Sequence, residues 1–462
     1  MSTYLLRRLL LMFPTLLGIT LVVFVVMAAA PGGISAQALV DGLNLEPQAK
    51  QALEDYYNRR YGLDQPAPVQ YLRWLNNVSP VGFRTDEATG ELGRFSLFKG
   101  SDLGTSFRYG RPVMDLIAER LPITLLLNVI SIPLIYVIAI AVGVHAATRR
   151  GSSFDVSSSV VMLGLWSVPT MLAGVLMIGF FASDQFWRWF PTGGLSRREA
   201  LDMPFLPHWG SLGDVLAVFL LAGIGAVLLV WLSIRGAVRL RMAVLGVLGA
   251  VAGALVASQP AGMAGFGVFN VVMAVLVGGM LAGIGWSGFD SLRTVTLGLL
   301  GVILGVVVAA QIGQEGFVRG FLLDRSWHLV LPVICLSYGG FAFLAKLTRS
   351  SLLENLMADY ARTARAKGVA ERDVLWRHVF RNSLLPLITV SATLLPSLLA
   401  GSVIVETIFS IDGMGKLAVD AVRGRDRELV LSVTLISGLL TLAGYLLADL
   451  CYAIVDPRVS YD

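Results

Sequence analysis

Long apolar runs, separated by short polar segments, are the main pattern of this 462-residue sequence. A helix needs about 20 mostly apolar residues to cross a bilayer. By this criterion the pattern predicts an all-α integral membrane protein with about ten spans. The predicted spans are Leu9–Ala30, Leu121–Ala147, Val160–Ser183, Leu212–Ile234, Val238–Ser258, Phe266–Trp286, Val295–Ile312, Leu329–Leu347, Leu384–Ile408 and Leu429–Val455.

Basic residues between the apolar runs predict the orientation of the chain. Short loops on the cytoplasmic side of a membrane carry an excess of Lys and Arg. Basic clusters lie at 148–150, 235–241 and 349–381. All three fall on one side of the membrane if the N-terminus is cytoplasmic. We therefore expect both termini in the cytoplasm and the long segment 31–119 outside.

Composition agrees with a membrane protein and argues against several other classes. Hydrophobic residues make up 55% of the chain and charged residues 15%, whereas about 25% of a soluble domain is charged. The net charge is +5, but the arginines gather between apolar runs, which indicates membrane orientation rather than nucleic-acid binding. The two cysteines and four histidines are scattered without ligand spacing, so we predict no metal site and no cofactor.

An internal repeat lies in the middle of the chain. Leu240–Gln259 aligns without gaps on Leu292–Gln311, and ten of the twenty positions are identical. Similarity at a fixed offset usually has a structural origin, so we predict a duplicated helix pair whose two copies have the same orientation. The alternative is chance similarity between helices rich in Gly, Ala, Val and Leu.

Pairs of glycines four residues apart recur in the same helices, at 249 and 253, 279 and 283, and 301 and 305. Small residues at this spacing let two helix backbones approach closely. One interpretation is a docking surface for another subunit. The other, which we favour, is tight packing among the helices of this chain.

The segment Asp359–Pro386 carries the clearest functional pattern. It is predicted to form two short helices joined at Gly368, which has the position of a helix-terminating glycine. Arg365 lies in the last turn of the first helix, and Glu371 and Asp373 lie in the opening turn of the second. In these places the charges suit the helix dipoles. Pro386 is expected to mark the start of the following span.

An apolar stripe is expected on the second of these helices. Val374, Leu375, Val379 and Phe380 recur at helical spacing. A protruding helix pair with such a stripe requires a groove on a partner. The alternative is a solvated basic loop without a partner.

This segment resembles the cytoplasmic coupling segment, or EAA loop, of ABC importer permeases. Aligned on Gly368, the Glu-Ala-Ala of the family falls on Arg362, Thr363 and Ala364, so the glutamate is absent. The form Arg-Thr-Ala-Arg-Ala-Lys-Gly is typical of dipeptide and oligopeptide permeases. The run Trp376–Asn382 is most similar to the microcin C-type oligopeptide permease branch.

Further stretches resemble the same subfamily, and together the resemblance covers 1–207 and 325–462. These stretches are Tyr4–Gly33, Gly100–Arg108, Leu121–Thr124, Val405–Lys416 and Val455–Arg458. The common pattern has six spans, so about four are extra. The expected organisation is a first transmembrane helix at 1–30, an extracytoplasmic region at 31–119, core helices at 120–207, inserted helices at 211–324, and core helices at 325–462 with a coupling loop at 350–383.

The resemblance implies a type I (MetI-like) permease subunit of an ABC importer for peptides in the bacterial inner membrane, without a catalytic site of its own. It implies four partners: a second, different permease subunit, two cytoplasmic ATPases that bind the ATP, and an extracytoplasmic solute-binding protein. The residues that it implies for contact with the ATPase are Arg362, Thr363, Ala364, Gly368, Glu371 and Arg377. No pattern identifies the residues of the substrate pathway.

The residues alone leave two other functions open. A secondary transporter driven by an ion gradient would have repeats and charged residues near the membrane midplane. Here the repeat is confined to the insert, and Glu406 and Asp449 lie toward span ends, where polar anchors are equally expected. A membrane receptor or scaffold would use the segment 31–119.

The sequence does not predict ATP binding by this chain itself. The segment Gly413–Lys416 has the glycines and lysine of a phosphate-binding loop but lacks the spacing that such a loop requires.

Overall fold

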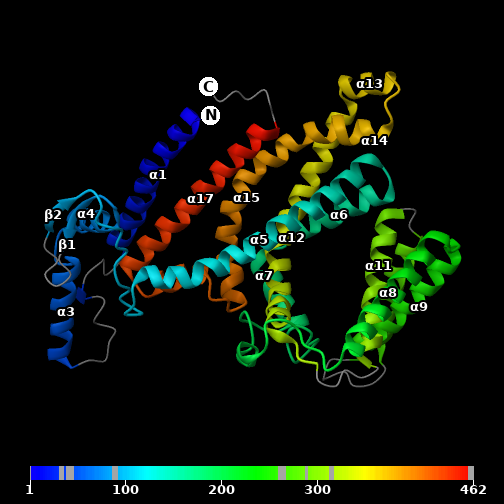
Figure 1. Ribbon diagram of the computed structural model, residues 1–462, viewed down its shortest axis with the longest axis horizontal. Helices are drawn as coiled ribbons and strands as arrows, with labels where there is room; N and C mark the ends of the chain where they lie inside the picture. Colours follow the sequence, from blue (N-terminus) through cyan, green and yellow to red (C-terminus); the bar gives the residue numbers. More distant parts are fainter. Residues whose placement is uncertain are drawn as a thin grey trace. The chain divides into compact units, whose positions relative to one another are not determined.

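The computed structural model describes residues 2–30, 36–37, 46–85, 92–258, 267–286, 290–311 and 317–455. Within these residues helices predominate, and the named strands form one two-stranded antiparallel sheet (Figure 1). The chain divides into two compact units. The first consists of Met1–Gly174 and Pro332–Asp462, and the second of Val175–Leu331.

The first unit contains the elements on both sides of the inserted helices in the sequence. Those before the insert are α1 (Ser2–Ala29), α3 (Pro47–Tyr61), α4 (Ala67–Val78), β1 (Gly82–Thr85), β2 (Leu92–Ser96), α5 (Val113–Thr148) and α6 (Ser153–Ser167). Those after it are α13 (Asp359–Ala366), α14 (Glu371–Asp373), the π-helical turn η2 (Val374–Val379), α15 (Phe380–Ile408), α16 (Met414–Arg423) and α17 (Arg427–Val455). The helices α7 (Thr170–Phe181) and α12 (Gly320–Met357) begin in one unit and end in the other.

The predicted all-α membrane fold is confirmed. Eight helices in the described part of the chain are long and apolar enough to cross a membrane, and the bent pair α6–α7 adds a ninth span if it is counted as one. The helices α5 and α12, with 36 and 38 residues, continue beyond the predicted apolar runs. The predicted span Leu384–Ile408 lies in α15, whose side chains at 391–397 and 399–401 are outside the described residues.

The predicted span Val160–Ser183 was wrong as a single straight helix. A bend of 97° separates α6 from α7 at Val168 and Pro169. Val168 has an extended backbone (φ −82°, ψ 122°), as expected for a residue before proline. The hydroxyl of Tyr338 donates to the Val168 carbonyl at 2.6 Å, which satisfies an acceptor that the break would otherwise leave exposed in an apolar environment.

A buried polar cluster fastens the segment between α1 and α5 to the start of α17. Ser106 Oγ donates to the Asp426 carboxylate, and Arg427 donates to Gln70 Oε1 at 3.0 Å and pairs with Glu428. Burial raises the pKa of the Asp426 carboxyl, and the hydrogen bonds that it accepts oppose this shift. Because these polar groups are buried and satisfied, they hold the segment in one position.

Two carboxylates near span ends act as anchors between helices. Glu406 of α15 is buried and accepts hydrogen bonds from Thr124 Oγ1 of α5 at 2.7 Å and from the backbone N–H of Lys416 at 3.0 Å. Asp449 of α17 forms an ion pair with Arg8 of α1 at 2.9 Å. These contacts agree with the anchoring interpretation of both carboxylates.

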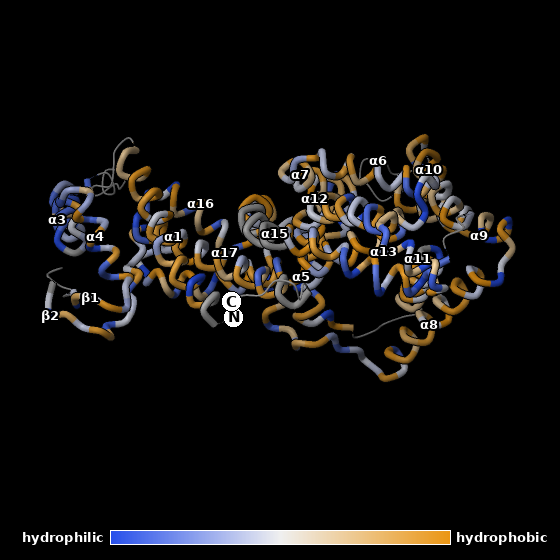
Figure 2. The backbone as a smooth tube through the Cα atoms, turned by 90° about the horizontal axis from the view of Figure 1, so that it is seen from above, coloured by the Kyte–Doolittle hydropathy of each residue, from blue (hydrophilic) through white to orange (hydrophobic). Residues whose placement is uncertain are grey.

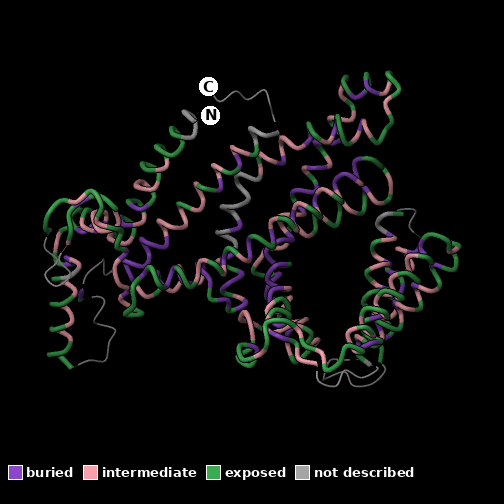
Figure 3. Tube along the Cα trace, in the orientation of Figure 1, coloured by how far each residue is buried: buried purple, intermediate pink, exposed green. Residues whose placement is uncertain are grey.

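The second unit is built around four helices, with a short 3₁₀ turn, η1, before them (Arg198–Asp202). In this unit α9 packs along α10, and α11 packs along α8. Each helix carries many exposed apolar side chains as well as buried positions (Figure 3), as expected for helices surrounded by lipid. The four helices are α8 (Leu212–Arg235), α9 (Val238–Ala257), α10 (Val268–Trp286) and α11 (Asp290–Gln311).

Glycines mediate both of these helix contacts, at equivalent positions. Gly249 of α9 lies against the carbonyl of Val277 in α10, and Gly301 of α11 lies against the carbonyl of Gly225 in α8. Gly301 lies 52 residues after Gly249, and Val277 lies 52 residues after Gly225 (301 − 249 and 277 − 225), so the two contacts are reciprocal under the repeat offset. The glycine pairs 249/253 and 301/305 thus pack tightly within the insert. Duplication of a helix pair stays a prediction, and this packing agrees with it.

We expect Gly301→Leu to destabilise the second unit, because the new side chain would collide with the backbone of α8. Overpacking of this kind costs about 1–3 kcal/mol. Thermal unfolding of the purified protein in detergent measures the effect. Gly279→Leu in α10 is the matched control, since no described atom lies within 4 Å of its added Cβ. Equal melting temperatures for the two variants would contradict the packing described here.

Candidate functional site

Residues Ala358–Val379, named here the Gly368 hairpin, form a protrusion between two long helices. The long helix α12 ends at Met357, and α13 follows after one extended residue. Beyond Gly368 the chain re-enters a helix through α14 and η2 and continues without a break into α15. Figure 1 shows α13 and α14 together at one extremity of α12 and α15. The hairpin is therefore helically continuous with α15 and joined to α12 through the single extended residue Ala358.

Gly368 has the backbone conformation that the sequence predicts for a helix-terminating glycine. Its φ is +80°, in the left-handed region, and its N–H donates to the carbonyl of Arg365 at 2.9 Å. The N–H of Val369 donates to the carbonyl of Ala364 at 3.2 Å. These bonds satisfy carbonyls at the end of α13. No described atom lies within 4 Å of a Cβ placed on Gly368, so the tip of the hairpin is open.

The apolar side of the hairpin packs against its own chain. Val374 and Val379 are fully buried, and they share a cluster with Val144 of α5 and Leu352 of α12. The prediction that this stripe needs a groove on a partner was wrong. Tertiary packing brings α5 and α12 under the stripe and covers it. Pro386 lies inside α15 rather than at its start.

The predicted contact residues divide into an exposed set, part of it charged, and one buried residue, Ala364. Arg362 is exposed and pairs with Asp359 within α13. Ala364 is buried in the cluster beneath the hairpin, so its side chain is not available to a partner. Thr363 is exposed, and its hydroxyl donates to the Asp359 carbonyl at 2.8 Å.

The other two predicted residues also lie on the exposed side of the hairpin. Glu371 accepts from Arg365 Nε at 2.8 Å and so links the two arms across Gly368. Arg377 is 79% exposed and lies 3.5 Å from Asp373. Exposed ion pairs of this kind contribute about 0–1 kcal/mol. The charges are therefore free to exchange these contacts for contacts with a partner.

Three exposed side chains on or beside the hairpin were not among the predicted contact residues. Trp376 is 46% exposed and lies edge-on against Phe380, with ring centroids 5.0 Å apart. Met357 and Tyr360 are exposed at the start of the hairpin. Aromatic residues and methionine are enriched at protein interfaces. Trp376 follows the buried Val374 in the π-helical turn, a helical form that is frequent at functional sites.

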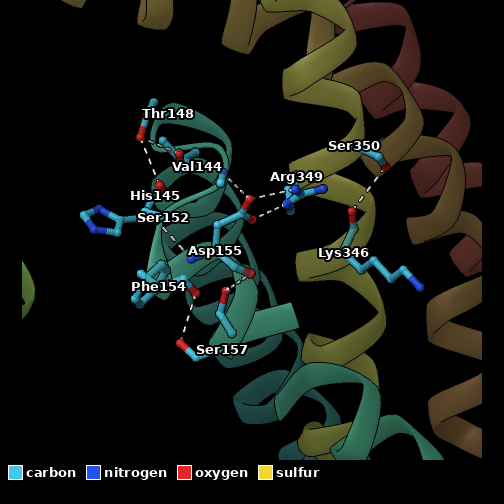
Figure 4. Close-up of polar contacts among 12 residues, drawn as sticks. Val144, His145, Thr148, Ser152, Phe154, Asp155, Ser157, Lys346, Arg349 and Ser350 are labelled. Atoms are coloured by element: carbon cyan, nitrogen blue, oxygen red, sulfur yellow. Dashed lines mark hydrogen bonds and ion pairs between the residues drawn. The ribbon is translucent and has the colours of Figure 1, made fainter. Parts of the chain in front are cut away.

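An ion pair between the buried Asp155 and the partly exposed Arg349 fixes α6 to α12 on the same side as the hairpin. Figure 4 shows Arg349 of α12 reaching both oxygens of Asp155 at the start of α6, with Arg349 Nη2 at 2.8 Å from Oδ2. The N–H of Gly151 also donates to Asp155, and Ser152 Oγ accepts from the Asp155 N–H. This two-pronged geometry is the strongest form of carboxylate–guanidinium contact. It was not predicted, because the partners are far apart in the sequence.

The sequence matches a known family of membrane transport proteins. Residues 139–461 match the model of the binding-protein-dependent transport system inner membrane component, and residues 1–128 match the model of the N-terminal part of such membrane components. The chain belongs to this family. As a member it is a multi-pass inner-membrane permease subunit of an ABC transporter, and ATP hydrolysis takes place in separate subunits.

Relatives named as permease proteins match over the whole chain. The oligopeptide transport system permease protein AppB of Bacillus subtilis (strain 168) is 30% identical over all of both chains. The peptidoglycan transport system permease protein YejB of Agrobacterium fabrum is 27% identical over all of this chain and 99% of its own. The inner membrane ABC transporter permease protein YejB of Escherichia coli O157:H7 is 25% identical over all of both chains.

We expect Asp155→Asn to lower the thermal stability of the protein, because it leaves the Arg349 guanidinium without its carboxylate. Breaking a buried ion pair costs about 3–5 kcal/mol, and partial exposure of Arg349 reduces this. Asp184→Asn is the matched control, since its pair with Arg188 is exposed on both sides. Melting temperatures in detergent provide the comparison. Equal losses in the two variants would show that the Asp155–Arg349 pair does not hold α6 to α12.

Proposed function

We propose that this permease imports peptides or peptide-like solutes and that the Gly368 hairpin is its contact with a cytoplasmic ATPase. The observation that carries the proposal is an exposed, charged hairpin tip on a base packed against α5 and α12. Both termini then lie in the cytoplasm, on the side of the hairpin.

The buried cluster beneath the hairpin supports a mechanical role. A segment that transmits force must move with the membrane helices to which it is attached. Val374 and Val379 pack against α5 and α12, and the chain runs from η2 directly into α15. Displacement of the hairpin by closing ATPases would therefore move these helices together. The Asp155–Arg349 pair extends the same rigid group to α6.

The expected assembly has a pore of two different permease subunits, two ATPases and an extracytoplasmic solute-binding protein. The proposed coupling residues at the surface are Arg362, Thr363, Gly368, Glu371 and Arg377. Ala364 packs in the buried cluster beneath the hairpin and holds this surface in place. The peptide substrate class is supported by relatives named for oligopeptide transport and putative peptide transport. The run Trp376–Asn382 supports placement in the microcin C-type branch. Uptake of a defined peptide mixture by the reconstituted assembly tests the substrate class.

We expect Gly368→Val to abolish transport while the permease still inserts and assembles. A β-branched residue at φ +80° is strained by roughly 1–3 kcal/mol, which would reshape the tip. Peptide uptake and substrate-stimulated ATP hydrolysis in proteoliposomes measure the effect.

Gly110→Val is the matched control for this variant. Gly110 also has a positive φ, +61°, in open surroundings, but it lies outside the hairpin. Both variants carry similar backbone strain. Normal substrate-stimulated ATP hydrolysis in Gly368→Val would refute the coupling assignment.

Arg377→Glu is expected to weaken binding of the ATPase by roughly tenfold, about 1.4 kcal/mol, because it reverses a charge on the contact surface. Arg188→Glu is the control, since Arg188 is also 79% exposed and also pairs with an aspartate four residues away. Affinity of the purified ATPase for the permease pair in nanodiscs gives the answer. Unchanged affinity for Arg377→Glu would remove this residue from the contact surface.

A further inference from the structure

A large apolar groove lies between α1, α4 and β1 in the first unit. Its volume is about 810 Å³, within the range of sites that enclose small organic ligands. Phe13, Leu16 and Leu17 of α1 form one wall, and Leu72 of α4 and Val81 before β1 lie opposite. The lining is mostly apolar, with Arg73 and a few uncharged polar residues among it. We name it the α1–α4 groove.

The groove is continuous with the exposed apolar surface of a membrane-spanning helix. Its α1 wall belongs to the membrane-spanning stretch Leu6–Ala29, which is largely exposed along its length. The contact with α4 is fixed in place, since the Tyr71 hydroxyl donates to the Leu17 carbonyl at 3.1 Å. An acyl chain lying along α1 can therefore enter the groove without crossing water.

The helix α4 has the character of a helix that lies at a membrane surface. Tyr71 and Trp74 are buried on one side, while Leu72 is 62% exposed at the crest of the groove. A second apolar groove, on the other side of this crest, also includes Leu72 together with Phe24 and Val25 of α1. By contrast, α3 is hydrophilic (Figure 2).

Phe83 of the β1–β2 sheet lines the groove, and the sheet carries further exposed aromatic and basic side chains. Phe83 and Phe95 are paired across the strands, with ring centroids 5.5 Å apart, and both are exposed. Phe98, just after β2, is 89% exposed. Arg84 and Arg94 are exposed next to the two phenylalanines. Aromatic residues with neighbouring cations are typical of the interface between acyl chains and phosphate headgroups.

We propose that the α1–α4 groove binds an acyl chain of a membrane phospholipid. The exposed phenylalanines of the β1–β2 sheet lie at the boundary of the acyl region, and the arginines face the headgroup phosphates. A lipid is the occupant because the groove opens along a membrane-spanning helix and because a cation, Arg73 of α4, is among its lining residues. The lipid would fasten the segment between α1 and α5 to the membrane surface.

Quenching by brominated phospholipids tests this proposal. Cys335 and Cys451 are replaced by alanine, and a bimane fluorophore is attached through Val81→Cys in the groove. The importer, assembled with its partner subunits, is placed in nanodiscs made from phospholipids with brominated acyl chains. Tyr56→Cys on α3 is the control position. We expect loss of fluorescence at position 81 and no loss at position 56.

Two outcomes overturn the proposal. One is a label at position 81 that is not quenched in the assembled importer, which would mean that water or a protein subunit fills the groove. The other is equal quenching at positions 81 and 56. A second variant guards against disturbance by the label: Leu72→Asp should reduce quenching at position 81, whereas Leu72→Met should not, since a carboxylate at the crest disfavours an acyl chain.

Discussion

The contact of Val374 and Val379 with α5 and α12 is the interaction on which the rest of this structure depends. Because of this contact, the polar segment between two spans packs firmly against the membrane helices. Without that cluster, Gly368 would still end α13, but the charges around it would have no fixed relation to the membrane helices. Surface ion pairs such as Arg362–Asp359 could not supply this rigidity, because each contributes so little.

The same difference between buried and exposed contacts recurs elsewhere in the molecule. Buried contacts set positions, and exposed groups are left available for partners. Asp155–Arg349 fixes α6 to α12, Glu406 fixes α15 to α5, and the cluster around Asp426 fixes the segment before α5 to α17. Each uses a carboxylate with most of its acceptors satisfied, as burial in an apolar environment requires.

The inserted helices α8–α11 are held together by close backbone contact at glycines. Lipid removes most of the hydrophobic driving force between helices, so close backbone contact has to replace it. Gly249 and Gly301 provide that contact at equivalent places in two helix pairs. Gly279 and Gly283 have the same spacing but meet no described atom within 4 Å. Spacing alone therefore does not distinguish a packed glycine pair from an open one.

The amino-acid sequence by itself determined most of the apolar spans, the turn at Gly368 and the family, although α5 and α12 extend well beyond the predicted runs. These features depend on local composition and backbone conformation, which residues close together in the sequence determine. Only the tertiary structure decided the 97° bend between α6 and α7, the burial of the Val374 stripe and of Ala364, and the Asp155–Arg349 pair. These depend on which distant segments meet, and a periodic apolar pattern shows that a face is covered without showing by what.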